Sequence, residues 1–258
     1  MLLAIDIGNT TIHAGVFRDR DLGPTWRLAT DHDRLADEYG IQLVSLLRTQ
    51  SVDPDTIDAA IVSSVVAPLQ PVFQAVCRRF FGVEPLLVGV HLRGVPPIEY
   101  DRPSDVGADR ICDAVAAMDR YGPGPLIIVD FGTGTVFDAI DERGRYVGGA
   151  IAPGIGIAAD ALFERAPRLP KIDLERPPAA IGTNTINAVQ SGLLFGYVGL
   201  VEGLIERFKQ ELGGGTVIGT GGWSARIAKE TTAVDIVDAD LTLEGMQLLY
   251  SLNAEGTP

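Results

Sequence analysis

The sequence predicts an α/β protein made of two copies of one folding unit. The segment AIDIGNTTI at residues 4–12 aligns with IVDFGTGTV at residues 128–136, so that an aspartate, a glycine and a threonine recur 124 positions apart. After each segment the pattern continues with further strands and then alternates between helices and strands. This repeated succession predicts two duplicated α/β domains, at residues 1–118 and 119–258.

Apolar periodicity predicts the elements of the first half. Short apolar runs bounded by turn residues indicate buried strands, and apolar residues recurring every three or four positions indicate helices. The expected order is strands at residues 1–5, 11–17 and 25–30, a helix at 33–50, a strand at 56–66, a helix at 68–82, a strand at 84–90 and a helix at 111–122. The segment 91–110 contains three prolines and two glycines. A loop of this length in a compact domain is usually either functional or disordered.

The same criteria apply to the second half. The expected order is two strands within 125–140, a strand at 145–154, helices at 155–166 and about 183–212, a strand at 215–222 and a final helix at 241–252. The apolar stretch Ala188–Ile205 carries glycines at 192, 196, 199 and 203, which is helical spacing. Two interpretations stay open for it: a helix packed closely on a second copy of the chain, or a central core helix of the second domain.

Composition limits the classes of partner. The net charge is −13, from 21 basic and 34 acidic residues, which argues against nucleic-acid partners and anionic membrane surfaces. The first apolar stretch is too short for a signal peptide, and we expect no membrane span. Two scattered cysteines indicate free thiols in a reducing compartment, and three dispersed histidines argue against a histidine-ligated metal. The expected location is cytoplasmic.

The two strand ends have the residues of a phosphate site. A carboxylate such as Asp6 at the end of a buried strand is costly unless something compensates it. The glycine, the main-chain N–H groups and the hydroxyls that follow can cradle phosphate oxygens, and an aspartate can hold Mg²⁺ through water. Two such ends facing each other would clamp a phosphate chain. The alternative is that each motif is only a strand followed by a tight turn.

The loop before residue 111 offers a candidate general base. Asp109 in SDVGADR stands beside Arg110, so the acid could take a proton from a substrate hydroxyl while the arginine holds the substrate. The alternative is structural, with Ser104 capping the helix and Asp109 placed at its positive end. A second glycine turn, IGTGGWSARIA at residues 218–228, could accept a flat nucleoside.

Taken together, these motifs resemble the type III pantothenate kinases, which belong to the acetate and sugar kinase/Hsp70/actin superfamily. The resemblance rests on DIGNT, YDRPSDVGADR, DFGTGT, GGAIAPG, ALFERAPRLP, IGTNTINAVQSG, GTGG and LTLEGMQLLY, in this order along the chain. It implies two ribonuclease H-like domains of actin/Hsp70/sugar-kinase type, with the active site in the cleft between them. It also implies ATP-dependent phosphorylation of pantothenate to 4'-phosphopantothenate, the first step of coenzyme A synthesis.

The resemblance also implies roles for individual residues. Asp109 would be the general base, Asp6 would lie near Mg²⁺ through water, and Asp130 would bind a monovalent cation, K⁺ or NH₄⁺. The implied ATP and phosphate contacts are Asp6, Ile7, Gly8, Asn9, Thr10, Thr11, Ile12, His13 and Thr133. The implied pantothenate contacts are Tyr100, Gly107, Ala108, Asp109, Arg110 and Thr185, the last reaching the partner's site in a homodimer.

Three positions depart from the family's pattern. Arg102 stands where family members often have asparagine, Gly134 stands in place of an alanine, and Val136 in place of a threonine. We therefore assign no role to position 136. Two other functions remain open at this stage: a related kinase of another small hydroxyl compound, and a non-catalytic regulatory accessory factor of the same fold. The GADR and IGTNT segments favour pantothenate, and the retained Asp109 argues against a dead enzyme.

Overall fold

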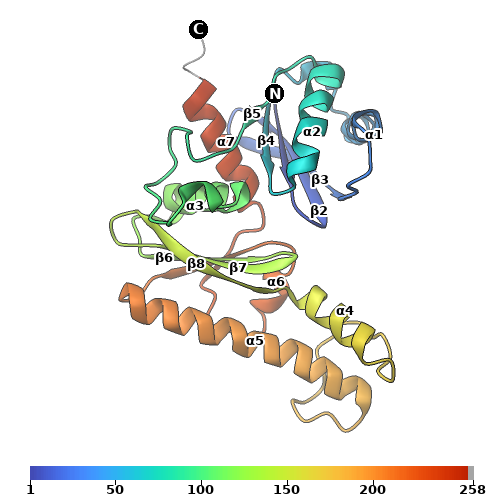
Figure 1. Ribbon diagram of the computed structural model, residues 1–258, viewed down its shortest axis with the longest axis vertical. Coiled ribbons are helices and arrows are strands. Elements are labelled where there is room, and N and C mark those ends of the chain that lie inside the picture. Colours follow the sequence, from blue (N-terminus) through green and yellow to red (C-terminus); the bar gives the residue numbers. More distant parts are fainter. Residues whose placement is uncertain (255–258) are drawn as a thin grey trace. The chain divides into compact units, whose positions relative to one another are not determined.

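The computed structural model describes residues 1–254, while residues 255–258 lie outside its described part. The chain divides into two compact units (Figure 1). The first comprises Met1–Arg120 together with the C-terminal segment that begins at Asp240, and the second comprises Tyr121–Ala239. Each contains one five-stranded sheet with helices packed on it.

The first unit has a mixed sheet in the order β3-β2-β1-β4-β5. Its strands are β1 (Leu2–Ile7), β2 (Thr11–Arg18), β3 (Asp21–Ala29), β4 (Ala59–Ser64) and β5 (Leu86–Leu87). Its helices are α1 (Ala36–Thr49), α2 (Gln70–Val76), continued by a π-helical turn at Cys77–Phe81, α3 (Ala108–Tyr121) and α7 (Leu241–Ala254). Leu3, Ile5 and Ile7 of β1 form a core with residues of α1 and α2. Asp6 therefore points to the other face of the sheet, because successive side chains of a strand alternate.

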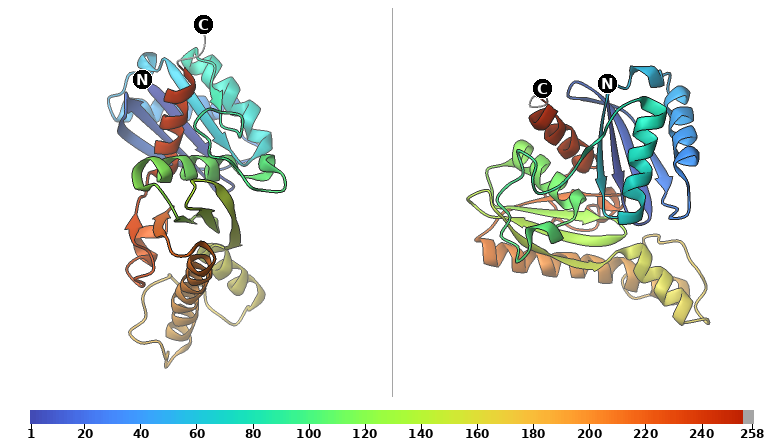
Figure 2. Two further views of the ribbon diagram at one scale, coloured as in Figure 1. Left: turned by 90° about the vertical axis from the view of Figure 1, so that its left-hand side faces the viewer. Right: turned by 45° about the horizontal axis from the view of Figure 1, so that its top comes forward.

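The second unit repeats this arrangement. Its strands are β6 (Leu126–Phe131), β7 (Gly134–Ile140), β8 (Tyr146–Pro153), β9 (Thr216–Thr220) and β10 (Ile236–Val237), and its helices are α4 (Ile155–Arg165), α5 (Thr185–Leu212) and α6 (Ser224–Ile227). Figure 2 shows α5 lying along one face of the sheet. Ile127, Val129 and Phe131 of β6 pack against α5 there, so that Asp130 points to the opposite face.

The predicted duplication is confirmed by the topology of the two sheets. In both units the first strand pairs antiparallel with the second and parallel with the fourth. The order β8-β7-β6-β9-β10 is the counterpart of β3-β2-β1-β4-β5. Both bounds of β6 lie 124 positions after those of β1. The fold is therefore the two-unit α/β arrangement that the sequence predicts.

The final helix belongs to the first unit, whereas the sequence placed it in the domain 119–258. Its residues Leu241, Leu243, Met246 and Leu249 are fully buried, and α7 packs on β1, β2 and β4. The division between the units accordingly falls after Arg120 and again before Asp240. Apolar periodicity shows that a helix has a buried face, but it does not show which sheet buries it.

Three further elements differ from expectation. The predicted strand at 84–90 contracts to β5, and β10 had no expected counterpart. The helix expected at 111–122 starts three residues earlier, at Ala108. Ser104 consequently does not precede that helix directly but lies in a separate 3₁₀ turn, Pro103–Asp105. Asp109 thus stands inside the first turn of α3.

One helix of the described residues, α5, is long and apolar enough to cross a membrane by length and composition. This helix of 28 residues contains an 18-residue window with a mean hydropathy of 1.5 and no more than two charged residues. A helix that packs one face on a sheet can pass the same test, so length and composition alone are weak evidence. Here one face of α5 is buried, through Leu194, Tyr197, Val198, Val201 and Ile205.

Candidate functional site

Asp6 lies at the carboxyl end of β1, flanked by polar side chains on both neighbouring strands. It stands opposite His13 on β2 and opposite Ser63 on β4, and residues opposite each other in a sheet share a face. Asp6 itself is half-buried, and Ser63 is fully buried. The end of β1 is thus a polar patch on the face of the sheet that does not carry α1 and α2.

His13 does not supply a charge to compensate Asp6 near neutral pH. Burial, with a smaller effect of the charge on Arg27, lowers the pKa of His13 to about 4. The imidazole is therefore neutral at physiological pH.

The side chains of Ile7 and Ile12 are fully buried in the core, so only their main-chain atoms could meet a ligand. Asn9 and Thr10 are exposed in the turn between them.

Asp109 and Arg110 lie together in the first turn of α3. The main-chain N–H of Arg110 donates to Asp109 Oδ1 at 2.8 Å. The Arg110 side chain is 7% exposed, and its guanidinium carbon lies 5.8 Å from the ring centre of Tyr100. Burial raises the pKa of Asp109, although the neighbouring Arg110 opposes this effect. A carboxylate with a raised pKa is a stronger base than an ordinary one.

Gly107 leaves the space that the Asp109 carboxylate occupies. A Cβ atom added at Gly107 would lie 2.5 Å from Asp109 Oδ1 and 3.3 Å from Val65 Cγ1. The first distance is far below an ordinary contact, so a side chain at 107 would displace the carboxylate. The glycine of the GADR segment is therefore explained by the position of the acid two residues later.

We expect Gly107→Ala to lower kcat while the protein remains folded, because the added methyl group pushes the Asp109 carboxylate aside. A displacement of about 1 Å near the reacting atoms can reduce the rate roughly 100-fold. Steady-state kinetics alongside thermal unfolding would measure this. Gly82→Ala is not a suitable control because Gly82 has a φ of +70°. Gly156→Ala is suitable, since a Cβ there meets nothing within 4 Å. Equal kcat values in the two variants would contradict the prediction.

The charges of Asp6 and Asp109 both act on the buried thiol of Cys112. Burial raises the pKa of Cys112 well above its ordinary value, and the charges of Asp6, Asp113 and Asp109 add to the effect. The thiol is thus protonated, and three carboxylates from β1 and α3 lie within electrostatic reach of it. Two residues 103 positions apart, which the sequence assigned separately to phosphate and substrate, share one region of the first unit.

Sequence reasoning missed Asp113, Ser63 and Thr242 in this region. Asp113 is 2% exposed and accepts a hydrogen bond from Thr242 Oγ1 of α7 at 2.7 Å. The i to i+4 spacing of Asp109 and Asp113 on a helix could have signalled that they share a face. Nothing in the local sequence could have signalled the contact with α7, because its partner lies 129 positions away.

Asp130 occupies the equivalent strand end in the second unit. It stands opposite Val136 on β7 and Thr220 on β9. A Cβ added at Gly221 would lie 2.2 Å from Asp130 Oδ1, and one added at Gly132 would lie 3.2 Å from Asp130 Oδ2. Gly221 also has a φ of +85°. The carboxylate therefore fits into a space lined by two glycines, Gly132 in the turn after β6 and Gly221 in the turn after β9.

The loop after Asp130 is fixed by the main chain. Gly154 N donates to the carbonyl of Thr133 at 3.2 Å, and a Cβ at Gly154 would lie 2.2 Å from that oxygen. Thr135 forms a buried hydrogen bond with the hydroxyl of Tyr197 on α5. Burial raises the pKa of Tyr197, and the charge on Asp130 contributes in the same direction. The second strand-end motif is thereby tied to the long helix.

Thr185 lies elsewhere in the second unit. It is the first residue of α5, which is capped by Asn184 through a hydrogen bond from Asn187 N to Asn184 Oδ1 at 2.9 Å. Thr185 is exposed and lines an apolar groove together with Leu162, Leu169, Ala188, Val189, Gly192 and Leu193. The structure therefore joins this predicted substrate residue to α4 and α5, and not to a strand end.

Within the part of the chain that the structure describes, no group of three or more His, Cys, Asp or Glu side chains is arranged to hold a metal ion. Mg²⁺ commonly keeps several waters and takes only one or two carboxylates together with substrate phosphates. The half-buried carboxylate of Asp6 at the end of β1 fits that pattern.

Comparison with known proteins decides the family. The sequence model described as type III pantothenate kinase matches residues 2–207. A type III pantothenate kinase of Roseiflexus sp. (strain RS-1) is 50% identical over 98% of this chain and 99% of its own length. Another, from Moorella thermoacetica, is 47% identical over 98% of this chain and 100% of its own. The chain belongs to the type III pantothenate kinase family.

Solved structures support the fold at much lower identity. The activator of 2-hydroxyisocaproyl-CoA dehydratase from Clostridium difficile, solved with bound ADPNP, is 13% identical, with a TM-score of 0.52, over 97% of this chain and 94% of that one. The inorganic polyphosphate/ATP-glucomannokinase of Arthrobacter sp. strain KM is 15% identical, with a TM-score of 0.50, over 97% and 98%. This type III pantothenate kinase family member therefore has the actin/Hsp70/sugar-kinase fold, as the sequence predicted.

The departures from the pattern of type III pantothenate kinases leave these sites intact. A Cβ at Gly134 would meet Ala152 O at 3.5 Å, which is an ordinary contact, so the glycine is not required by lack of space. Val136 stands directly across from Asp130, where a threonine would add a hydroxyl. Arg102 is exposed before the 3₁₀ turn. None of the three contacts Asp109 through a bond that the structure defines.

Proposed function

We propose that this protein transfers the γ-phosphoryl group of ATP to the terminal hydroxyl of pantothenate, the first step of coenzyme A synthesis. The observation that carries the proposal is the nearly full-length match to type III pantothenate kinases, and it is supported by Asp109 in the first turn of α3, where burial raises its pKa. The net charge of −13 and two buried free cysteines support a cytoplasmic enzyme without nucleic-acid or anionic membrane partners.

Asp109 is the proton acceptor in this proposal. As the pantothenate oxygen forms a bond to the γ-phosphorus, the bond from that phosphorus to the ADP oxygen breaks, and the hydroxyl proton passes to Asp109. Arg110 N–H holds one carboxylate oxygen in place. The guanidinium of Arg110 beside Tyr100 supplies a positive group for the pantothenate carboxylate. Gly107, Ala108 and Thr185 are further proposed substrate contacts.

The strand-end turns hold the nucleotide in this proposal. The proposed contacts to ATP and its phosphates are the residues from Asp6 to His13, together with Thr133. Asp6 would hold Mg²⁺ through water, and Mg²⁺, when bound, neutralises charge on the transferring phosphates. Asp130 would hold K⁺ or NH₄⁺.

The function is tested by measuring ADP release with and without pantothenate, in K⁺ and in Na⁺. We expect release that depends on pantothenate and on K⁺. We also expect Asp130→Asn to lower activity in K⁺ by roughly 10- to 100-fold, because a hydrogen-bonded charged contact is worth about 1.5–3 kcal/mol. Absence of pantothenate-dependent ADP release in both salts would contradict the function. Equal activity in K⁺ and in Na⁺ would contradict only the proposed role of Asp130 as a ligand of the monovalent cation, and not the proposed function.

We also propose that the protein is a homodimer joined through α5. The glycines at 192, 196 and 199 lie on the exposed side of this helix, and a Cβ added to any of them meets nothing within 4 Å. Ile186, Leu200 and Leu162 nearby are exposed large apolar side chains. Small residues at helical spacing allow a second helix to approach closely, and a large exposed apolar surface is typical of an interface.

A charged side chain in that surface is expected to separate the dimer. Gly196→Arg should give the mass of one chain in light scattering, because an unpaired charge would have to be buried in the interface. Gln210→Arg, an exposed position in the last turns of the same helix, should leave the dimer intact. A monomeric wild-type protein, or a dimeric Gly196→Arg variant, would contradict this interface.

A further inference from the structure

One residue at the end of the third strand fastens the first strand-end turn. The hydroxyl of Thr30 donates to the carbonyl of Gly8 at 2.7 Å, and the main-chain N–H of Thr30 donates to the carbonyl of Thr10 at 3.0 Å. Within the turn, Gly8 N donates to the carbonyl of Thr11 at 3.1 Å. Thr30 thus holds two carbonyl groups of the turn, those of Gly8 and Thr10.

These two bonds decide where the donors of the turn point. In a planar trans peptide the carbonyl and the following N–H point in opposite directions. Holding the carbonyls of Gly8 and Thr10 toward Thr30 therefore turns the N–H groups of Asn9 and Thr11 away from it. An anion-binding turn depends on such N–H groups converging on one side. Without the bonds from Thr30, either peptide could rotate and direct a carbonyl oxygen at the anion.

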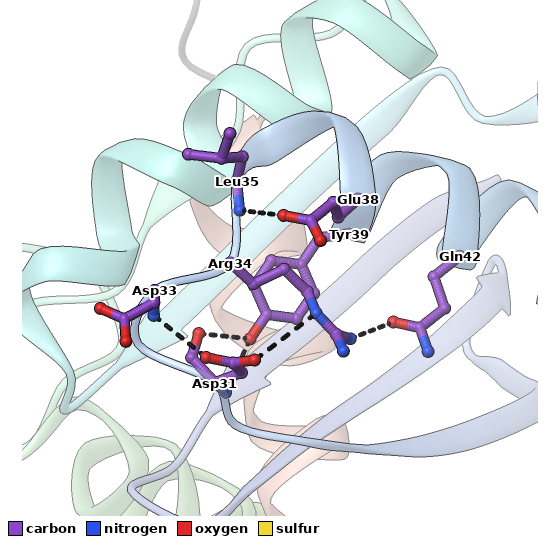
Figure 3. Close-up of polar contacts among 7 residues, drawn as sticks. All are labelled: Asp31, Asp33, Arg34, Leu35, Glu38, Tyr39 and Gln42. Carbon is purple, nitrogen blue, oxygen red and sulfur yellow. Dashed lines mark hydrogen bonds and ion pairs between the residues drawn. The ribbon is translucent and has the colours of Figure 1, made fainter.

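Thr30 is itself held by the hydrophobic core. Figure 3 shows the hydroxyl of Tyr39 meeting the main chain of Asp31, the residue after Thr30. The hydroxyl donates to Asp31 O and accepts from Asp31 N, both at 2.9 Å. The Tyr39 ring is fully buried and lies 4.7 Å from that of Phe73. Arg34 covers the ring at 5.3 Å.

The connection extends along the start of α1. Arg34 donates to Gln42 Oε1 at 2.8 Å, and the Leu35 main-chain N–H donates to Glu38 Oε2 at 2.9 Å (Figure 3). The bond from Leu35 to Glu38 fixes the first turn of the helix, as in a capping box. The segment between Thr30 and α1 is consequently held at both ends, and Tyr39 transmits the rigidity of the core to the strand-end turn.

We propose that Thr30, anchored by Tyr39, is a positioning residue that presets the first strand-end turn for the phosphates of the nucleotide. The inference rests on the proposed role of this turn in binding ATP. Thr30 itself does not contact the reacting atoms. It acts through the orientation of the peptides after Gly8 and Thr10, so its removal weakens nucleotide binding and leaves pantothenate binding unchanged.

The test compares Thr30→Val with Thr30→Ser. Valine keeps the branched shape but removes the hydroxyl, whereas serine keeps the hydroxyl. A net hydrogen bond of about 0.5–1.5 kcal/mol corresponds to roughly a 2- to 12-fold change. We expect Thr30→Val to raise KM for ATP and the Kd for ADP by about this factor, with KM for pantothenate unchanged, and Thr30→Ser to restore both values. Tyr39→Phe should shift KM for ATP in the same direction.

Thr49→Val is the matched control. The hydroxyl of Thr49 also donates to a main-chain carbonyl, that of Leu46 at 2.6 Å, but at the exposed end of α1. The variant Thr49→Val should leave KM for ATP and the Kd for ADP unchanged. If Thr30→Val binds ADP as tightly as the wild type, or if both KM values rise together, the positioning role is overturned. If Thr30→Val does not fold, the same comparison of KM for ATP, Kd for ADP and KM for pantothenate is made with Thr30→Ser and Tyr39→Phe.

Calorimetric titration with ADP and Mg²⁺, without any phosphoryl acceptor, separates this inference from the proposed function. A wild-type protein that binds ADP but does not phosphorylate pantothenate would overturn the proposed substrate. In that case weaker ADP binding by Thr30→Val would still support the role of Thr30. A wild-type protein that binds no nucleotide would overturn both.

Discussion

Asp109→Asn should remove nearly all phosphoryl transfer while the protein stays folded. General-base catalysis is typically worth about 10²- to 10⁴-fold, so we expect kcat to fall within that range. Asparagine has nearly the same shape, and its side-chain oxygen can still accept from the Arg110 N–H that now holds Asp109 Oδ1. Pantothenate affinity should therefore change much less than kcat. Steady-state kinetics with both substrates varied would show this division.

The pH dependence of the wild type provides an independent check. Burial raises the pKa of Asp109 in the folded protein, and a base must be deprotonated to act. Activity should therefore be present above the raised pKa and fall as the pH decreases through it. The loss should start at a higher pH than for an ordinary carboxylate. The acidic limb of the kcat/KM profile reports this pKa in the free enzyme.

Asp105→Asn is the control for Asp109→Asn. Asp105 is an exposed acid in the 3₁₀ turn just before α3, so its substitution removes the same charge from the same segment. It should keep wild-type kcat and an unchanged acidic limb. A variant Asp109→Asn with kcat close to that of Asp105→Asn would contradict the base assignment. Loss of the secondary-structure signal in Asp109→Asn would indicate a structural role of the kind considered from sequence alone.

Gly245→Ala is expected to have the largest effect on stability. Gly245 lies where α7 meets α3, and a Cβ added there would lie 1.9 Å from the carbonyl oxygen of Cys112 and 2.5 Å from its carbon. Main-chain atoms cannot move aside as a flexible side chain can, so the two helices must separate. Overpacking of this kind typically costs about 1–3 kcal/mol, and sometimes more. Thermal and urea unfolding would measure the loss.

The same substitution should also reduce kcat. The contact at Gly245 is made with Cys112, three residues after Asp109, and the adjacent bond from Thr242 to Asp113 joins the same two helices. A shift of α3 away from α7 would move the Asp109 carboxylate. Gly156→Ala is again the control, because its Cβ meets open space in α4, and helical alanine is favoured over glycine by about 1 kcal/mol. Equal free energies of unfolding for Gly245→Ala and Gly156→Ala would contradict the close contact between α7 and α3.

Several titratable groups surround the carboxylate of Asp6. His13, the cation candidate directly across the sheet, is neutral because burial lowers its pKa to about 4. Asp109 and Asp113, which lie with Asp6 around Cys112, are acids and add negative charge. Arg110 supplies a positive charge beside Asp109, and the Mg²⁺ that we propose at Asp6 would add further positive charge.

Sequence alone determined most of the local structure and the candidate chemistry. The offset of 124 positions predicted the duplicated sheets, and apolar runs predicted both strands that end in aspartate. These features depend on neighbouring residues, whose alternation of apolar and polar side chains can be seen directly. The GADR segment also indicated Asp109 as a proton acceptor and Arg110 as a substrate ligand, because an acidic and a basic side chain stand side by side there at the end of a long loop.

Only the tertiary structure decided which distant residues meet. It placed α7 on the first sheet, set Asp6 and Asp109 within electrostatic reach of the same thiol, joined Thr30 to the turn after Asp6, and set Gly245 against Cys112. Each of these links joins residues that are at least 20 positions apart, and most join residues more than 100 apart. Their formation depends on packing between faces that are equally apolar in the sequence, so periodicity cannot distinguish the partner that each face selects.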